Sequence, residues 1–259
     1  MNCDISHLLD RWDYRPGDVM VRKINGRDGR TKLQLRVDLG ILQMNTEGRP
    51  DGKRPNGHES FFDFLLSRLD AHMSEEGSDT QFKLNSEQCI RLHLEALQFH
   101  HRYICMLQLE EHEAVERDCI RNLGVFDFVG RYAGAPAMAW SLQQFRPQLL
   151  MILTRARATP LLRKRRTAKA ITEIESGMQM IGDFYQETDR PDLKEASLEI
   201  ESLQNWLSDI KSHRAPRKKM SRRELLELQL SEAVQKEDYE RAAQLRDQLR
   251  NLKPRAKQH

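Results

Sequence analysis

The stretch that decides the fold runs from Asn85 to Ile104 and reads NSEQCIRLHLEALQFHHRYI. Asn85 and Gln88 have the spacing of a capping box, in which two residues bond each other's backbone N–H at the start of a helix. Behind this start, apolar side chains and one histidine recur at alternating steps of four and three residues: Ile90, Leu94, Leu97, His101 and Ile104. This spacing puts them on one face of a helix, which we expect to be the buried face.

A partner helix is expected over Glu110–Leu123. It begins with the carboxylates Glu110, Glu111 and Glu113, which are favoured near the positive end of the helix dipole. It should end at Gly124, because glycine is common just past the last helical residue. The two helices would then form an antiparallel hairpin around a short turn.

The same theme is expected on both sides of this hairpin. Upstream, a short apolar helix covers Phe61–Leu69, and downstream Pro147 fits the first turn of another helix. Thr167 is a candidate cap for the next helix, and Leu193–Ile210 carries the most regular apolar stripe in the chain. The predicted fold is therefore mainly α, a stack of antiparallel helical hairpins. It resembles a tetratricopeptide array in architecture, although a clean ~34-residue period is missing from the sequence.

The N-terminal part is the only β-like region. In Thr31–Ile41 every second residue is apolar, which predicts one strand with a buried face: Leu33, Leu35, Val37, Leu39 and Ile41. Asp18–Ile24, followed by the turn-forming Asn25–Gly29, supplies the other arm of a β-hairpin. Two strands are marginal alone, so this hairpin should lie on the helices or pair with another chain.

Asn45–His58 follows as a long loop rich in glycine and proline. Loops of this length are uncommon unless they are functional or disordered, and both interpretations stay open at this point. Four basic side chains of the loop could grip an anion, although nothing in the sequence fixes their geometry: Arg49, Lys53, Arg54 and His58.

Composition excludes several classes of protein. The chain has 259 residues, 31% of them charged and 7% aromatic, and a net charge of +3 gives no global argument for nucleic-acid binding. No run approaches the ~20 apolar residues of a membrane span, and the acidic, broken start is unlike a signal peptide. Four cysteines without a CxxC pair suit a reduced, cytoplasmic protein. We expect no cofactor and no membrane partner.

The chain is expected to divide into a β-hairpin with a long loop over 1–60, a helical body over 61–210, a basic linker over 211–220 and a last unit over 221–253. In this last unit Ser221 and Glu224 can form a capping box, and Asp238 can cap a second helix. Only Lys236-Glu237 separates the two helices, so they must be antiparallel neighbours. We call residues 221–253 the C-terminal hairpin.

The C-terminal hairpin lacks a complete core. Two helices of ~15 residues bury too little surface to be stable alone in water. The hairpin should therefore take the missing surface from the body of the protein, from a second copy or from another protein. We interpret it as a docking module; the alternative is a helix pair packed permanently on its own body. Its apolar side is supplied by Leu226, Leu230, Ala233, Val234, Ala242, Leu245, Leu249 and Leu252.

Residues 230–252, LSEAVQKEDYERAAQLRDQLRNL, resemble the UVR motif, the short helical hairpin shared by UvrB and UvrC. The resemblance implies a role in pairing proteins, as between excision-repair subunits, Clp-type chaperone subunits or McsA-like adaptors. It implies a docking surface of Tyr239, Glu240, Ala242, Ala243, Leu245, Arg246 and Asp247. With Leu226, Leu230, Ala233 and Leu249 these form the expected partner-binding set. No helicase motif, Walker loop or paired CxxC zinc site accompanies the motif.

Two other groups of residues suggest a binding site. Cysteines and histidines at helical spacing suggest a metal ligand set, but no second pair completes a tetrahedron, so we expect no metal and a structural role: Cys89, His93, His100, His101, Cys105 and His112. Basic clusters could contact phosphates, or could simply be a solvated helix end and an extended linker: Arg163, Lys164, Arg165 and Arg166, and Arg217, Lys218 and Lys219. No aromatic residues are interleaved with them for base stacking.

The predicted function is that of a non-enzymatic adaptor or scaffold. It would dock on a UVR-bearing partner, or on itself, through the C-terminal hairpin, in DNA repair or in protein quality control. The alternative is a nucleic-acid-binding accessory protein of excision repair that uses the basic linker and the basic helix patch. No Ser/His/Asp or Cys/His catalytic set can be assembled from this sequence, so we expect no enzymatic activity.

Overall fold

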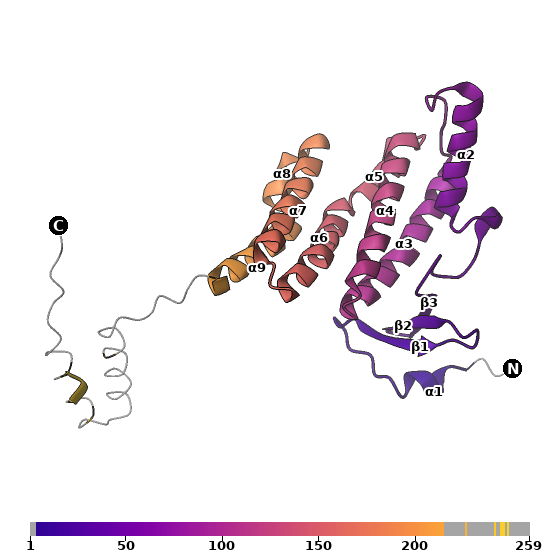
Figure 1. Ribbon diagram of the computed structural model, residues 1–259. Helices are drawn as coiled ribbons and strands as arrows, with labels where there is room; N and C mark the ends of the chain where they lie inside the picture. Colours follow the sequence, from indigo (N-terminus) through magenta and orange to yellow (C-terminus); the bar gives the residue numbers. More distant parts are fainter. Residues whose placement is uncertain (1–3, 215–225, 227–240, 242–243, 247, 249–259) are drawn as a thin grey trace. The chain divides into compact units, whose positions relative to one another are not determined.

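The computed structural model of this protein describes residues 4–214, 226, 241, 244–246 and 248. The chain divides into two compact units, Met1–Leu207 and Ser208–His259. The first unit holds a small antiparallel sheet and a series of helices (Figure 1), which confirms the mainly α fold. In the part of the chain that the structure describes, no helix has both the length and the hydropathy that crossing a bilayer requires.

The sheet has three antiparallel strands in the order β1-β2-β3, and so adds a strand to the expected hairpin: β1 (Met20–Asn25), β2 (Thr31–Val37) and β3 (Gly40–Asn45). The prediction of one strand over 31–41 is wrong, because the chain turns after Val37, which pairs with Gly40. Residues that pair across a two-residue turn share a face, so the alternation changes parity there. Met44 therefore joins Leu33 in the core, whereas Leu39 lies in the turn and is 88% exposed.

The N-terminal segment, which includes the short helix α1 (Ser6–Leu9), lies against the polar face of the sheet. Arg36 of β2 is buried, and its Nε donates a hydrogen bond to the carbonyl oxygen of Trp12 at 2.8 Å. The guanidinium of Arg22 lies 4.1 Å from the centroid of the Trp12 ring. The sheet is therefore covered on both faces, by this segment and by the helical core.

The helices follow the sheet in one continuous series. Their bounds are η1 (Pro55–Gly57, a 3-10 turn), α2 (Phe61–Glu76), α3 (Ser86–Gln108), α4 (His112–Tyr132), α5 (Pro136–Gln143), α6 (Arg146–Arg163), α7 (Thr167–Glu187), α8 (Pro191–Glu195) and α9 (Leu198–Arg214). Helices α3 and α4 form the expected antiparallel pair around a three-residue turn (Figure 1), and α6 packs on both α4 and α7. One apolar core joins the sheet with α2, α3, α4 and α6.

The predicted start of α3 is confirmed. Asn85 Oδ1 accepts a hydrogen bond from the N–H of Gln88 at 2.8 Å, and Gln88 Oε1 accepts one from the N–H of Asn85 at 2.9 Å. The predicted end of α4 at Gly124 is wrong, because the helix continues to Tyr132. Gly124 instead lies inside α4, where it faces the ring of Phe62 on α2. A Cβ at this position would lie 3.5 Å from that ring, which is an ordinary contact, so nothing in the structure explains the glycine.

The second half of the body also differs from expectation at element ends. Pro147 lies in the first turn of α6 as predicted, whereas Thr167 is the first helical residue of α7 and does not cap it. The single helix expected over Leu193–Ile210 is interrupted, and Ser197 starts α9 by accepting the N–H of Ile200 on its hydroxyl at 3.3 Å. The apolar residues keep their helical spacing across this short break, so the spacing does not show that the helix is interrupted.

Candidate protein-interaction surfaces

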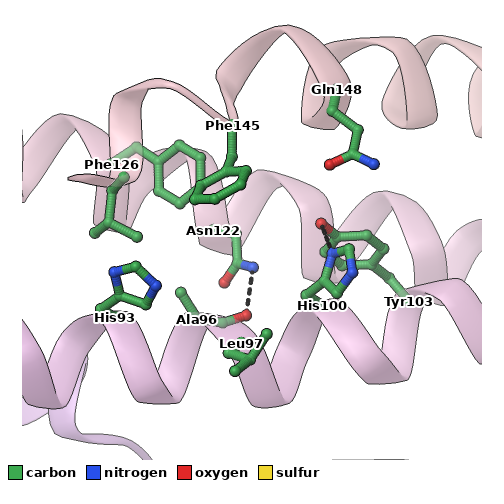
Figure 2. A pocket seen from close by; sticks show the side chains of 10 residues that line it. His93, Ala96, Leu97, His100, Tyr103, Asn122, Phe126, Phe145 and Gln148 are labelled. Atoms are coloured by element: carbon green, nitrogen blue, oxygen red, sulfur yellow. Dashed lines mark hydrogen bonds between the residues drawn. The ribbon is translucent and has the colours of Figure 1, made fainter. Parts of the chain in front are cut away.

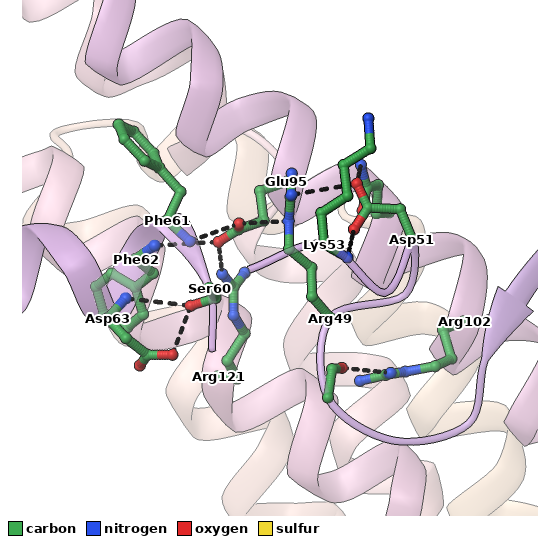
Figure 3. Close-up of polar contacts among 12 residues, drawn as sticks. Arg49, Asp51, Lys53, Ser60, Phe61, Phe62, Asp63, Glu95, Arg102 and Arg121 are labelled. Carbon is green, nitrogen blue, oxygen red and sulfur yellow. Dashed lines mark hydrogen bonds and ion pairs between the residues drawn. The ribbon is translucent and has the colours of Figure 1, made fainter. Parts of the chain in front are cut away.

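The segment between β3 and α2, residues 46–60, is fastened to the helices by Glu95 of α3 (Figure 3). The Glu95 carboxylate is fully buried and accepts the backbone N–H groups of Phe61 at 2.8 Å and Phe62 at 3.1 Å, at the start of α2. Arg49 Nε lies 2.8 Å from Glu95 Oε2, and Arg121 of α4 contacts the other carboxylate oxygen. One carboxylate thus connects the loop with three helices.

A second buried ion pair holds the same loop. Arg102 of α3 and Asp118 of α4 are each 1% exposed and meet through two hydrogen bonds of 2.6 and 2.8 Å. Arg102 Nη1 also donates to the carbonyl oxygens of Gly48, at 2.7 Å, and Asn45, at 3.2 Å. The ion pairs of Glu95 and the ion pair of Arg102 with Asp118 are both buried and hydrogen-bonded. Such pairs can fix one arrangement of a loop, because breaking either of them leaves a buried charge uncompensated.

This geometry bears on the anion-binding interpretation of the loop. Arg49 is paired with Glu95 and also lies 3.2 Å from Asp51. Arg54 is paired with Glu59 at 2.5 Å. The two arginines therefore neutralise carboxylates of their own chain, and the arrangement gives the loop a structural role.

The basic cluster Arg163–Arg166 forms the turn between α6 and α7. Arg163 ends α6 and contacts the carboxylate of Glu110. Lys164, Arg165 and Arg166 are exposed, and within residues 4–214 none of the three has an ion-pair partner. The expected linker positions Arg217, Lys218 and Lys219 lie outside the described residues.

The cysteines and histidines of α3 and α4 are packed as structural groups. Cys89, Cys105 and Cys119 are buried free thiols, and burial raises the pKa of Cys105 to about 12. A thiol with such a pKa stays protonated at neutral pH and is a poor nucleophile and ligand. Burial lowers the pKa of His100 and His101. Among the residues that the structure describes, no three His, Cys, Asp or Glu side chains could hold a metal ion together.

The apolar stripe of α3 faces outward over its first half. Ile90 is 52%, Leu94 56% and Leu97 43% exposed, whereas Leu92 and Phe99, from the other side of α3, are buried. The prediction that the stripe is the core face is therefore wrong for these three residues. Helix α3 carries apolar residues on two faces, and spacing alone does not say which of them the rest of the protein covers.

Two hollows lie beside the exposed stripe. One of about 170 Å³ lies between α3 and the α5–α6 junction, and Figure 2 shows its walls. It is lined by His93, Ala96, Leu97, His100, Tyr103, Asn122, Phe126, Leu142, Phe145 and Gln148. The other, of about 260 Å³, is lined by Cys89, Ile90, His93, Leu94, Met138 and Ser141. Neither lining contains Asp, Glu, Lys or Arg.

Sequence reasoning missed the residues that Pro136–Phe145 contributes to the two hollows, which are Met138, Ser141, Leu142 and Phe145. Trp140 is 37% and Phe145 46% exposed, and both come from Pro136–Phe145, PAMAWSLQQF. A signal was present, because this uncharged run with two large aromatic residues is unusual in a chain with 31% charged residues. The run is short and follows no clear period, so its spacing alone predicts neither a helix nor a strand.

Of the expected partner-binding set, the structure describes Leu226, Leu245 and Arg246. Leu226 and Leu245 are helical and 7% exposed, while Arg246 and its neighbour Gln244 are helical and exposed. Around Leu245 the chain thus has a buried side and a solvent-facing side. The other members lie outside the described residues: Leu230, Ala233, Tyr239, Glu240, Ala242, Ala243, Asp247 and Leu249.

Comparison with known proteins bears on this last unit. Residues 221–253 match the family model of the UvrB/uvrC motif, UVR. The match confirms the resemblance found in the sequence and indicates a role in UvrABC-type DNA repair or in protein interaction. No curated protein and no solved structure matches the chain.

Proposed function

We propose that this protein is a non-enzymatic adaptor that docks on another protein through its C-terminal hairpin. The partner would be a second UVR-bearing protein or a second copy of this chain. The observation that supports the proposal is the UVR match over residues 221–253, which belong to a compact unit of their own. A unit with a small core gains stability when a partner covers its surface, since anything that binds only the folded state stabilises it.

The described residues of this unit differ in solvent exposure, and this difference separates residues that a partner can reach from residues that it cannot. Leu226 and Leu245 are buried in this chain, so a partner has little access to their side chains. Arg246 is exposed, so it is available to a partner. A charged side chain at the rim of an interface sets orientation and partner choice more than total affinity. Reversing its charge therefore tests docking without removing an apolar contact.

A pull-down with purified UvrB and UvrC tests the proposal, with the full chain and a 1–214 truncation as baits. The truncation ends where α9 ends and keeps the whole body. We expect the full chain to retain at least one partner, or to self-associate in sedimentation, and the truncation to do neither. Equal recovery by both baits would remove the hairpin's role.

A nucleic-acid-binding role is the second candidate, and the turn at Lys164, Arg165 and Arg166 favours it. These three consecutive cations are exposed and have no ion-pair partner within residues 4–214. Each phosphate contact adds ~0.9 to the slope of log affinity against log salt. If the turn binds DNA, changing all three residues to glutamate should lower that slope by ~3 in a salt titration. A slope that stays the same would exclude this turn as a DNA contact.

A further inference from the structure

We propose that the body of this protein carries a second docking site, which binds an amphipathic helix of a partner protein through an uncharged apolar surface. The site consists of the outward stripe of α3 and the two hollows beside it. We call it the α3–α5 face and define it by Ile90, Leu94, Leu97, Met138 and Phe145. It lies entirely in the first unit and does not involve the C-terminal hairpin.

The exposure of the stripe is the first observation. Scattered apolar residues are common on protein surfaces, but a contiguous group of large ones marks an interaction site. Ile90, Leu94 and Leu97 are each about half exposed and follow one another along a single helix. Their steps of four and three residues match the seam of a coiled coil, which accepts the side chains of another helix between its own. A β-strand, with its period of two, would not match this seam.

The hollow at Phe145 identifies one feature of the partner helix. Its volume of about 170 Å³ is close to the ~150 Å³ of an apolar cavity that binds benzene, so it accepts one aromatic ring. The Asn122 amide donates to the carbonyl oxygen of Ala96 at 2.9 Å, and His100 Nδ1 lies 2.7 Å from the Tyr103 hydroxyl oxygen (Figure 2). These polar groups are satisfied within the chain and require nothing from a ligand.

Two other polar side chains that line the same hollow are available to hydrogen-bond a ligand. Among the described residues, His93 and Gln148 have no hydrogen-bond partner, although His93 makes a T-shaped ring contact with Phe145. Tyrosine and tryptophan combine an apolar ring with one polar group that seeks a partner when buried. The hollow therefore favours Tyr or Trp over Phe on the partner helix.

Charge selects a protein partner over a nucleic acid. No charged residue lines either hollow, so the phosphates of a nucleic acid and the side chains of an acidic peptide would find no counter-charge. Nearby cations are engaged elsewhere: Arg146 contacts Asp127, and the Arg91 guanidinium lies 3.8 Å from the centroid of the Phe61 ring. An uncharged face is complementary to an uncharged face, which the apolar side of an amphipathic helix provides.

Selection from a random 16-residue peptide library, displayed on phage, tests this proposal with the full chain as the target. We expect enriched peptides to carry one Trp or Tyr together with Leu or Ile at steps of three and four. Leu94→Asp should weaken their binding by more than about tenfold, as expected for a central apolar contact. Ile120→Asp is the matched control, because Ile120 is a similarly exposed (47%) apolar residue of α4 that lines neither hollow, and it should leave binding unchanged.

Several results would overturn the proposal. They are no enrichment, a consensus of charged or strictly alternating residues, and equal losses in the Leu94→Asp and Ile120→Asp variants. A dimer that Leu94→Asp dissociates in sedimentation would assign the face to a second copy of the chain instead. The 1–214 truncation should bind the selected peptides as the full chain does, so failure here and failure of UVR-mediated docking are distinguishable.

Discussion

At the scale of single residues, Gly177 allows α6 and α7 to approach closely. A Cβ atom at this position would lie 2.0 Å from Thr154 Oγ1. Thr154 is 1% exposed, and its hydroxyl donates to the carbonyl oxygen of Leu150 at 2.8 Å, so it has little room to move. We predict that Gly177→Ala lowers the free energy of unfolding by ~2–3 kcal/mol, measured by urea denaturation.

Gly124→Ala is the control for this substitution. Gly124 is also helical, but a Cβ atom at this position would lie 3.5 Å from the ring of Phe62, which is an ordinary contact. The alanine should therefore be neutral or stabilise by up to ~1 kcal/mol through helix propensity. Equal effects of the two substitutions would contradict the close approach of α6 and α7.

The Glu95 carboxylate supports a second prediction at this scale. Because Glu95 is buried and pairs with Arg49 and Arg121, Glu95→Gln removes the carboxylate partner of Arg121 and leaves Arg49 only its contact with Asp51. We expect the free energy of unfolding to fall by ~3 kcal/mol, as for other broken buried pairs. Glu47→Gln removes an exposed carboxylate of the same loop, paired with Arg117, and should cost less than ~1 kcal/mol. A comparable cost for both variants in urea denaturation would contradict the anchoring role of Glu95.

At the scale of elements, α3 carries a pH dependence. Burial lowers the pKa of His100 and His101, whereas a histidine in the unfolded chain has a pKa of ~6.5. Below that pH the unfolded chain binds protons that the folded chain resists, so the free energy of unfolding falls. Above that pH the contribution of the two histidines to the free energy of unfolding is fully present. Carboxylates with a lowered pKa, such as Asp79, titrate at lower pH and do not interfere.

We predict that the protein is less stable towards urea at about pH 5.5 than at about pH 7.5. His100→Gln should remove part of this difference, since glutamine can keep the hydrogen bond to Tyr103 and has no charge to gain. Equal stability at both pH values, or greater stability at the lower one, would show that these histidines take up protons freely in the folded state.

The elements also show which parts of the fold sequence reasoning could reach. The α3 cap was predictable, because a capping box depends only on residues three apart. The outward direction of Ile90, Leu94 and Leu97 was not, because it depends on which face of α3 the other elements cover. The continuation of α4 beyond Gly124 was missed for the same reason, because the residues that follow, such as Phe126 and Val129, are buried in a core that distant elements complete. Features that depend on residues close in sequence could therefore be predicted, whereas features that depend on tertiary packing could not.

At the scale of the whole molecule, the two proposed docking surfaces differ in how far the sequence alone reveals them. The C-terminal hairpin was recognisable as a UVR motif from spaced residues within 230–252, because the motif is contiguous in sequence. The α3–α5 face combines residues of α3, α5 and the α5–α6 junction, so only the folded chain brings them together. A protein with one docking site in each of two units could link two partners, which is what an adaptor requires.

The most direct test of the central proposal is the affinity of the full chain for its UVR-bearing partner, measured by isothermal titration calorimetry. We compare wild type with Arg246→Glu and with the control Gln248→Glu, since both residues are exposed and helical. We predict that Arg246→Glu weakens binding about tenfold, which is ~1.4 kcal/mol, while Gln248→Glu and the body variant Leu94→Asp leave it unchanged. Wild-type affinity in Arg246→Glu, together with full binding by the 1–214 truncation, would contradict it.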